Sequence, residues 1–415
     1  MLTSRLLFFA QSFIEQHEYK GEKETDMPFK YAQRLEMLPK YLFAELDRIK
    51  SEQIAAGKDI IDLGVGDPDL PTSTEVVAAL QSAAQDPANH IYPSYSGMDR
   101  FREVAAEWFY KRFGVKLDYK KQVLSLIGSK EGIAHFPLAF VNPGDVVLYT
   151  EPGYPVYFAS TIFAGGTPYA LPLTKENNFL PSLDSIPVQI LEKAKMLFIN
   201  YPNNPTSSTA GEAFFKKVIA FAKKHHIIIA HDAAYSEIYF GEKTHSILEY
   251  PGAMDVAIEF HYLSKTFSMT GWRIGFACGN EDLIAGIGKI KTNIDSGVFQ
   301  AVQWAGIKAL TLGDALTEPL RKIYKKRVHM VTSALSAAGL DPFNGKSTFY
   351  IWTKLPNNID SMSFTMKLVQ QAGIVVSPGI GFGKSGEGYF RISVTNKDEL
   401  IQKACENISK VLTKG

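Results

Sequence analysis

The chain has 415 residues, 46% of them hydrophobic and 21% charged, which is the balance of an ordinary globular protein. Its net charge of +1 gives no general attraction to nucleic acid or to an anionic membrane, so any anion must be bound locally. No apolar run approaches the roughly 20 residues of a membrane-spanning helix. The two cysteines lack metal-ligand spacing, so we expect a cytoplasmic protein without disulfides or a metal site.

Residues 1–33 lack the pattern of a folded domain, and we expect an N-terminal extension that can be disordered. Residues 34–66 predict an amphipathic helix closed by Gly57, then a strand that breaks into a Gly/Pro turn. We expect this segment to contribute to a small domain formed mainly by residues 301–415. That region predicts a long helical stretch, three strands and a closing helix.

Residues 67–300 alternate short apolar runs with helical stretches, and we expect them to form one large domain. The predicted strands are 123–128, 145–150, 195–200, 226–232 and 258–265. Nearly continuous apolar strands separated by helices predict an α/β fold with a mostly parallel sheet in three αβα layers. Ligands of such sheets bind beyond the carboxyl ends of the strands.

Polar residues of definite type stand at these predicted strand ends. Asp232 ends one strand, with Tyr235 one turn beyond, and a buried carboxylate there is costly unless a cation meets it. Asn204 lies in a proline-framed turn after another strand. Ser129 and Lys130 open a helix, where free backbone N–H groups make a phosphate site.

Lys265 and Arg273, in "YLSKTFSMTGWRIGF", complete the set of residues that pyridoxal phosphate requires. A lysine amine can bind the cofactor aldehyde as an imine and act as general acid and base. An aspartate keeps the ring nitrogen protonated, while a phenol and an amide bind the ring oxygen. Ser129, Ser264 and Arg273 can hold the phosphate. Each residue alone has an ordinary structural explanation, so the prediction depends on the ordered set.

From about residue 34 onward, the chain resembles the class I/II aminotransferases of the fold type I pyridoxal-phosphate enzymes. The likeness is carried by "YLSKTFSMTGWRIGF", "NYPNNPT", "DAAY" and "EPGYPVY". It implies that Asn204 contacts the cofactor and that Tyr154 stacks on its ring. It also implies a homodimer with shared sites, in which Tyr92 of "YPSYSGM" reaches the phosphate of the neighbouring subunit.

Arg391 lies in "GEGYFRISV", where period-two alternation places it on the polar face of a strand. Its planar fork suits a carboxylate. The resemblance implies that Arg391 binds the substrate α-carboxylate, with Asn204 and the backbone near Gly66. The nearby glycine-rich "SPGIGFGKSGEG" precedes a strand, so it is no dinucleotide fingerprint. We expect it to be a mobile or tightly turned loop beside Arg391.

The segments "YLFAELDR", "DLGVGDPDLPT", "PGYPVY" and "GEGYFRIS" look most like the LL-diaminopimelate aminotransferases. That likeness implies that Tyr41 crosses from the partner subunit to the distal end of the substrate and that Lys130 also lies near the substrate. Tyr95 and Ser96 stand where plant-type members carry a glutamate, so either distal recognition or the substrate differs.

The implied reaction is a ping-pong transfer of an amino group from glutamate to the open-chain keto form of tetrahydrodipicolinate, in lysine and cell-wall precursor synthesis. Aspartate, alanine and aromatic aminotransferases of the same group remain alternatives, followed by a carbon–sulfur lyase. A regulator with an aminotransferase-like domain would need a DNA-binding module, for which the N-terminal extension is too short and too weakly basic.

Overall fold

The computed structural model describes residues 29–39, 42–356 and 359–413. The chain divides into two units, residues 1–39 and 40–415, and the described part of the first contains the short helix α2 (Gln33–Glu36). The extension expected over residues 1–28 lies outside the described residues. Among the helices that are described, none combines the length and the apolar character needed to cross a membrane.

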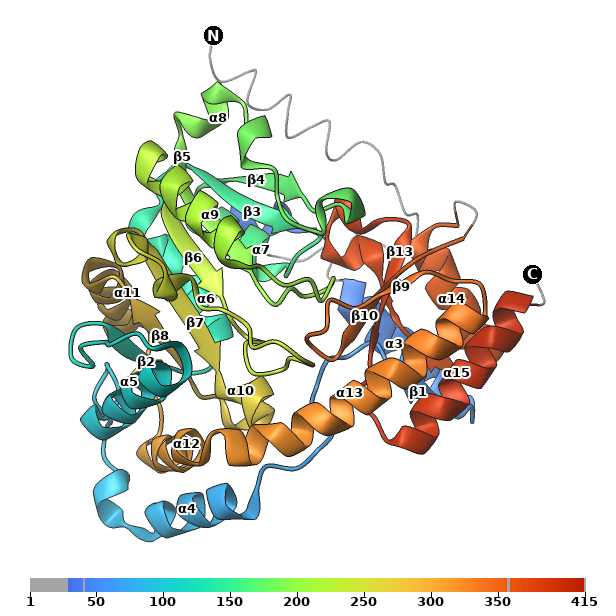
Figure 1. The fold of residues 1–415 in the computed structure, drawn as a ribbon, viewed down its shortest axis with the longest axis horizontal. Coiled ribbons are helices and arrows are strands. Elements are labelled where there is room, and N and C mark those ends of the chain that lie inside the picture. The colour runs from blue at the N-terminus through green and yellow to red at the C-terminus, as the bar shows by residue number, and fades with distance from the viewer. Residues whose placement is uncertain (1–28, 40–41, 357–358, 414–415) are drawn as a thin grey trace. The chain divides into compact units, whose positions relative to one another are not determined.

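The main sheet of the second unit has seven strands in the order β2-β8-β7-β6-β5-β3-β4 (Figure 1). The strands are β2 (Val123–Leu126), β3 (Val146–Glu151), β4 (Thr167–Pro172), β5 (Ala194–Asn200), β6 (Ile228–Asp232), β7 (Ala257–Tyr262) and β8 (Gly275–Gly279). Only β8 runs antiparallel to its neighbours in this sheet, so the carboxyl ends of the other six strands lie at one edge.

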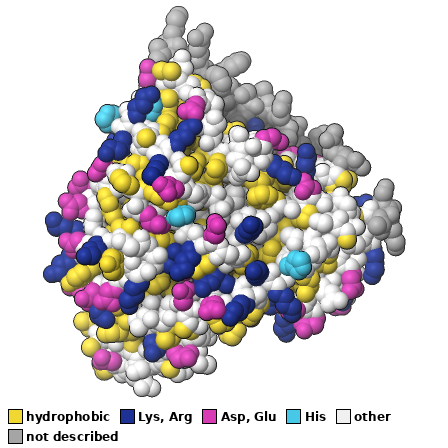
Figure 2. All heavy atoms as spheres, in the orientation of Figure 1, with side chains coloured by type: hydrophobic (Ala, Val, Ile, Leu, Met, Phe, Trp, Pro, Cys, Tyr) yellow, Lys and Arg dark blue, Asp and Glu magenta, His cyan; other side chains and the backbone are white. Residues whose placement is uncertain are grey.

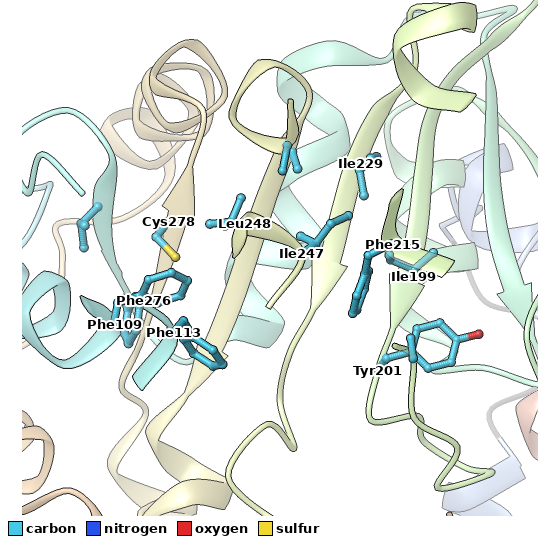
Figure 3. Close-up of a cluster of buried hydrophobic side chains, with 14 of the residues drawn as sticks. Phe109, Phe113, Ile199, Tyr201, Phe215, Ile229, Ile247, Leu248, Phe276 and Cys278 are labelled. Atoms are coloured by element: carbon cyan, nitrogen blue, oxygen red, sulfur yellow. The ribbon is translucent and has the colours of Figure 1, made fainter. Parts of the chain in front are cut away.

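Helices cover both faces of this sheet, which confirms the predicted three-layer α/β fold. One face is covered by α5 (Asp99–Phe113), α9 (Glu212–His225) and α12 (Gln300–Leu312), with α4 (Thr74–Gln85) packed against α12. The other is covered by α6 (Ser129–Phe140), α7 (Val156–Phe163) and α11 (Glu281–Ile294). Figure 3 shows part of the first core, where Phe109 and Phe113 of α5 meet Phe276 of β8, and Phe215 of α9 meets Ile229 of β6.

A smaller sheet has the order β12-β13-β10-β9, with antiparallel neighbours throughout. Its strands are β9 (Pro342–Phe343), β10 (Tyr350–Lys354), β12 (Ser377–Pro378) and β13 (Tyr389–Ser393). Two further strands, β1 (Ile61–Asp62) and β11 (Ile374–Val375), form a parallel pair. The helices beside these strands are α3 (Leu42–Ala55), α13 (Asp314–Ala337), α14 (Ser361–Ala372) and α15 (Asp398–Thr413). A second core joins α13, α14 and α15 to β10 and β13 (Figure 1).

The remaining elements are short. They are α8 (Val188–Leu191), α10 (Leu263–Thr266) and the 3-10 turns η1 (Pro87–Asn89), η2 (Lys175–Asn177), η3 (Leu183–Ser185), η4 (Ile247–Glu249), η5 (Ala253–Asp255), η6 (Thr270–Trp272), η7 (Gly379–Phe382) and η8 (Lys384–Gly386). Basic and acidic side chains lie interspersed on the face shown in Figure 2, in keeping with the near-zero net charge.

Three details differ from the sequence prediction. The predicted strand 258–265 is too long, because the chain turns into α10 at Leu263 and Lys265 therefore lies on a helical turn. The single long helical region is two helices, separated at Gly313, whose φ is +50°. Strands β4 and β8 were not predicted, because β4 contains two prolines and is only partly buried, while β8 is rich in small residues.

Candidate active site

Five of the predicted site residues gather at the carboxyl edge of the main sheet. Asp232 is the last residue of β6, and Asn204 follows the end of β5. Tyr154 follows β3, Ser129 opens the helix after β2, and Lys265 follows β7. Since β2, β3, β5, β6 and β7 all end at this edge, the fold brings these five side chains to one place.

Lys265 lies in a setting that favours the unprotonated amine. Its Nζ donates a hydrogen bond to the carbonyl oxygen of Gly66 at 2.7 Å. Burial lowers the pKa of Lys265 to about 8, opposed by the Asp67 carboxylate and aided by the guanidinium groups of Arg391 and Arg273. An amine with this pKa can serve as nucleophile and as general base near neutral pH.

Asp232 is buried, and both donors to its carboxylate among the described residues are uncharged. The Tyr157 hydroxyl donates to Oδ2 at 2.7 Å, and the Ala234 N–H donates to Oδ1 at 3.2 Å. Burial raises the pKa of the Asp232 carboxyl to about 6, although the Tyr157 hydrogen bond opposes the shift. A cationic ring nitrogen would favour the ionised carboxylate here. Sequence reasoning missed Tyr157, although it lies in the "EPGYPVY" motif, three residues after Tyr154.

The amide side chain of Asn200 links two of the predicted residues. Its Nδ2 donates to the backbone oxygen of Asp232 at 2.7 Å, and its Oδ1 accepts from the backbone N–H of Asn204 at 2.7 Å. The Asn204 side chain is thereby fixed relative to the buried carboxylate. Sequence reasoning singled out Asn204 but not Asn200.

Arg391 is buried, and its guanidinium packs against two aromatic rings. The ring centres of Tyr350 and Phe382 lie 4.2 and 4.7 Å from its Cζ. Its Nη1 donates to Asn204 Oδ1 at 2.7 Å, and its Nη2 donates to Ser377 Oγ at 3.1 Å and to the carbonyl of Gly64. The predicted pair of Arg391 and Asn204 therefore lies in direct contact.

Tyr235 belongs to the same cluster through a residue that the sequence did not indicate. Its hydroxyl lies 2.9 Å from the hydroxyl of Tyr350, which projects from β10 of the smaller sheet. A Cβ at Gly66 would stand 2.0 Å from the Tyr350 oxygen, so only glycine fits beside it. No sequence signal identifies Tyr350, because it stands in an ordinary apolar strand.

Ser129, Ser264 and Arg273 supply donors around the start of α6. A Cβ at Gly128 would lie 2.3 Å from an Nη atom of Arg273, which places the guanidinium against the turn that opens the helix. Ser264 Oγ is buried and makes no hydrogen bond with the described residues. Lys130 is exposed, with its Nζ 6.0 Å from the centre of the Tyr154 ring.

These residues fit pyridoxal phosphate. Two serine hydroxyls, a guanidinium and a helix N-terminus match a phosphate, and Ser264 Oγ is an orphaned donor. Lys265 and the buried Asp232 match the aldehyde and the ring nitrogen. Tyr92, by contrast, is 86% exposed, and the predicted Tyr41 lies outside the described residues.

A separate charged cluster lies along α6. Glu131 accepts from His135 Nδ1 at 2.9 Å and from Lys291 Nζ at 3.2 Å, and Lys291 also donates to Asp295 at 2.9 Å. The two carboxylates and the imidazole are close enough to hold a metal ion. The buried Lys291 ammonium already lies between the carboxylates, so this cluster is a structural ion-pair network.

Comparison with known proteins agrees with this site. Residues 58–408 match the family described as aminotransferase class I and II. The chain is 56% identical to an LL-diaminopimelate aminotransferase of Aquifex aeolicus, over 92% of this chain and 99% of that protein. It is 53% identical to one of Syntrophobacter fumaroxidans, over 93% and 100%. The solved structure of substrate-bound BacF from Bacillus subtilis is similar with a TM-score of 0.89 at 36% identity, over 92% and 98%. The chain therefore belongs to the class I and II aminotransferases, whose cofactor is pyridoxal phosphate.

Proposed function

We propose that this chain is an LL-diaminopimelate aminotransferase, exchanging an amino group between glutamate and the open-chain keto form of tetrahydrodipicolinate. The observation that carries this proposal is its 56% identity, over almost the whole length of both chains, to a relative of that name. The grouping of a lysine, a buried aspartate and a carboxylate-binding arginine at one sheet edge supports the chemistry of an aminotransferase.

Pyridoxal phosphate, when bound, supplies a conjugated ring that takes up the electron pair released at the substrate α-carbon. The Lys265 amine is placed to hold the cofactor covalently and to remove and return the α-proton. The Asp232 carboxylate, held by Tyr157, keeps the ring nitrogen protonated. Tyr235 and Asn204 would donate hydrogen bonds to the ring oxygen, and both residues are buried and hydrogen-bonded to their neighbours.

The remaining roles are those expected from the residue types and the family resemblance. Ser129, Ser264, Arg273 and the N-terminus of α6 would bind the phosphate, and Tyr154 would stack on the ring. Arg391 binds the substrate α-carboxylate, assisted by Asn204 and the backbone of Gly66. Lys130, exposed beside Tyr154, is available to cofactor and substrate. Residues 67–300 then form the cofactor domain, and residues 34–66 and 301–415 together form the small domain.

The active unit is a homodimer with shared sites. Tyr92 and Ile91 are 86% and 70% exposed, and Phe299 is also exposed. The two segments lie together, because the side chain of Gln300 donates to the Ile91 carbonyl. Exposed apolar side chains in one region mark an interaction surface. Tyr92 then contacts the phosphate of the neighbouring subunit, and Tyr41 approaches the neighbour's substrate.

Mixed dimers test this arrangement. Tyr92→Ala and Lys265→Ala chains, each poorly active alone, should regain activity when unfolded and refolded together. One site of the mixed dimer then combines an intact Lys265 with an intact Tyr92 from the other subunit. Absence of recovery in a verified mixed dimer would contradict sharing through Tyr92.

A cytoplasmic location is part of the proposal, supported by two free, buried cysteines.

An amino-donor panel with 2-oxoglutarate tests the substrate. We expect turnover of LL-diaminopimelate at a far higher kcat/KM than that of aspartate, alanine or aromatic amino acids. Turnover of one of those with none of LL-diaminopimelate would reassign the enzyme within its group. Release of ammonia and a keto acid without an amino acceptor would instead indicate a carbon–sulfur lyase, and a shift of operator DNA would indicate a regulator.

A further inference from the structure

The glycine-rich segment 379–388, which leads into β13, is tightly folded against the end of β3. It forms the two 3-10 turns η7 and η8, whose backbones meet closely: a Cβ at Gly379 would lie 1.9 Å from the oxygen of Gly386. Phe382, at the end of η7, is 3% exposed. The segment therefore places one aromatic ring at a defined position.

Glu151, the last residue of β3, holds this segment. Its Oε1 accepts from both the backbone N–H and the hydroxyl of Ser385, each at 3.0 Å, and its Oε2 accepts from the Tyr149 hydroxyl at 3.2 Å. A Cβ at Gly383, where φ is +110°, would lie 2.3 Å from the Glu151 carboxylate. The glycine therefore lets the backbone approach the carboxylate directly.

This carboxylate is largely buried and well supplied with donors. Glu151 is 9% exposed, and the Tyr149 hydroxyl and the two Ser385 groups that donate to it are uncharged. Burial, reinforced by the Glu151 charge, raises the pKa of Tyr149 well above its ordinary range, so its hydroxyl remains a donor. Hydrogen bonds to an ionised acceptor are about twice as strong as neutral ones, so the charge tightens this contact.

The contact continues to Arg391 through Phe382. The backbone N–H of Gly153, two residues after Glu151, donates to the Phe382 carbonyl at 2.9 Å. The Phe382 ring meets the edge of Trp352 at 5.9 Å between centres and lies over the Arg391 guanidinium at 4.7 Å. The Phe382 ring therefore packs directly against the guanidinium of Arg391.

We propose that Glu151 is a positioning residue for substrate carboxylate binding, acting through Ser385 and Phe382 on the guanidinium of Arg391. This inference rests on the proposed role of Arg391 as the α-carboxylate site. Loss of the Glu151 contacts lets segment 379–388 and its Phe382 ring move. The guanidinium of Arg391 then loses a side chain that fixes its orientation. Cofactor affinity should change little, because the described hydrogen bonds of Glu151 come from Tyr149 and Ser385 and not from the residues assigned to the phosphate or the ring nitrogen.

The test compares Glu151→Ala, Glu151→Gln and Ser385→Ala in the enzyme loaded with cofactor. Glu151→Ala should raise KM for both the amino acid and the 2-oxo acid about tenfold, the scale of one lost charged hydrogen bond, with a smaller change in kcat. Ser385→Ala keeps the backbone N–H that donates to Glu151. Its KM values should therefore lie between those of Glu151→Ala and the wild type. Glu151→Gln should recover most of the loss, because its amide can accept from Ser385 and donate to Tyr149.

Two measurements separate positioning from a general structural defect. Hydrogen exchange of the amides in segment 379–388 should accelerate in Glu151→Ala and Ser385→Ala, while the dissociation constant of pyridoxal phosphate should stay within about twofold of the wild-type value. Glu212→Gln is the matched control, because Glu212 is also hydrogen-bonded, to Lys216, but is itself exposed on the surface of α9. If Glu151→Ala does not fold, Ser385→Ala decides the outcome.

Unchanged KM in Glu151→Ala and Ser385→Ala would overturn the proposal, as would a loss of cofactor affinity equal to the rise in KM. Arg391→Gln distinguishes this result from a failure of the proposed function. If Arg391→Gln leaves KM unchanged, Arg391 is not the carboxylate site and both proposals fail. If Arg391→Gln raises KM while the Glu151 and Ser385 variants do not, only the role of Glu151 is wrong.

Discussion

The buried carboxylate of Asp232 should destabilise the cofactor-free protein at neutral pH, and Asp232→Asn should reveal the cost. Burial raises the pKa of this carboxyl from 3.8 to about 6. The folded state therefore binds the proton more tightly than the unfolded state. The contribution of Asp232 to the free energy of unfolding should therefore be largest below about pH 4 and should be lost as the pH rises through about 6.

The size of this effect follows from the shift. About two pKa units, at 1.36 kcal/mol each, correspond to about 3 kcal/mol above pH 6. Asparagine removes the charge, and its oxygen can accept from the Tyr157 hydroxyl. Its NH2 group then faces the Ala234 N–H, at a cost of about 1 kcal/mol. Asp232→Asn should therefore be about 2 kcal/mol more stable at pH 8 and slightly less stable below pH 4.

The assay is urea unfolding of both cofactor-free proteins, followed by tryptophan fluorescence at several values between pH 5 and 8. The difference in midpoint between variant and wild type is compared at each pH, with the slopes checked for equality. The difference should grow with pH. The prediction would be contradicted if the difference in midpoint stayed constant with pH, or if the wild type became more stable relative to the variant as the pH rose. Either result would show that a cation already compensates the Asp232 carboxylate. Pyridoxal phosphate should bind the variant more weakly in every case.

Three further predictions concern the lysine, the phosphate turn and the charged cluster on α6. Burial lowers the pKa of Lys265 to about 8. The rate at which the cofactor-free protein captures pyridoxal phosphate should therefore rise with pH and level off above about 8. Stopped-flow absorbance measures this rate, and a rate independent of pH would contradict the prediction. Lys265→Ala should hold pyridoxal phosphate only non-covalently, so that dialysis removes it, and should show no turnover. Gly128→Ala should weaken cofactor binding at least about tenfold by calorimetry, since φ is +71° and the new Cβ would meet Arg273; unchanged affinity would show that the turn can relax. Lys291→Met should lower the free energy of unfolding by about 3–5 kcal/mol, because it leaves two carboxylates without their buried ammonium. Thermal denaturation checks this value, and adding Glu131→Gln should recover part of the loss.

The sequence predicted the part of the site that belongs to the main sheet. Asp232 is the last residue of the buried strand β6, Asn204 lies in the turn after β5, and Lys265 follows β7, so each polar residue stands where an apolar run ends. Parallel strands end at one edge, so strand order was not needed to bring these residues together. Position within the strand pattern was sufficient, and the motif resemblance added the individual roles.

The smaller sheet contributed residues that no local pattern identifies. Tyr350 lies in an apolar strand and reaches the Tyr235 hydroxyl across 115 positions of sequence. Phe382 follows a glycine-rich turn, and its contact with Arg391 depends on how that turn packs. Glu151 belongs to a recognised motif, but its function follows only from Ser385, which lies 234 positions away. Such contacts arise from tertiary packing, which residue spacing along the chain does not encode.

The position of the substrate carboxylate relative to the reactive amine depends on how the two sheets meet. Lys265 follows a strand of the main sheet, whereas Arg391 lies on β13 of the smaller one. Several contacts across this boundary are hydrogen bonds: Arg391 with Asn204, Tyr350 with Tyr235, and Ser385 with Glu151. Each hydrogen bond contributes about 1 kcal/mol, or more where a charge takes part. A few individually weak hydrogen bonds therefore set the distance between the Arg391 guanidinium and the Lys265 amine. The residues proposed to bind the phosphate, Ser129, Ser264 and Arg273, lie in connections of the main sheet. Changes at the boundary should therefore alter KM for both substrates together, while changes around α6 should alter cofactor affinity first.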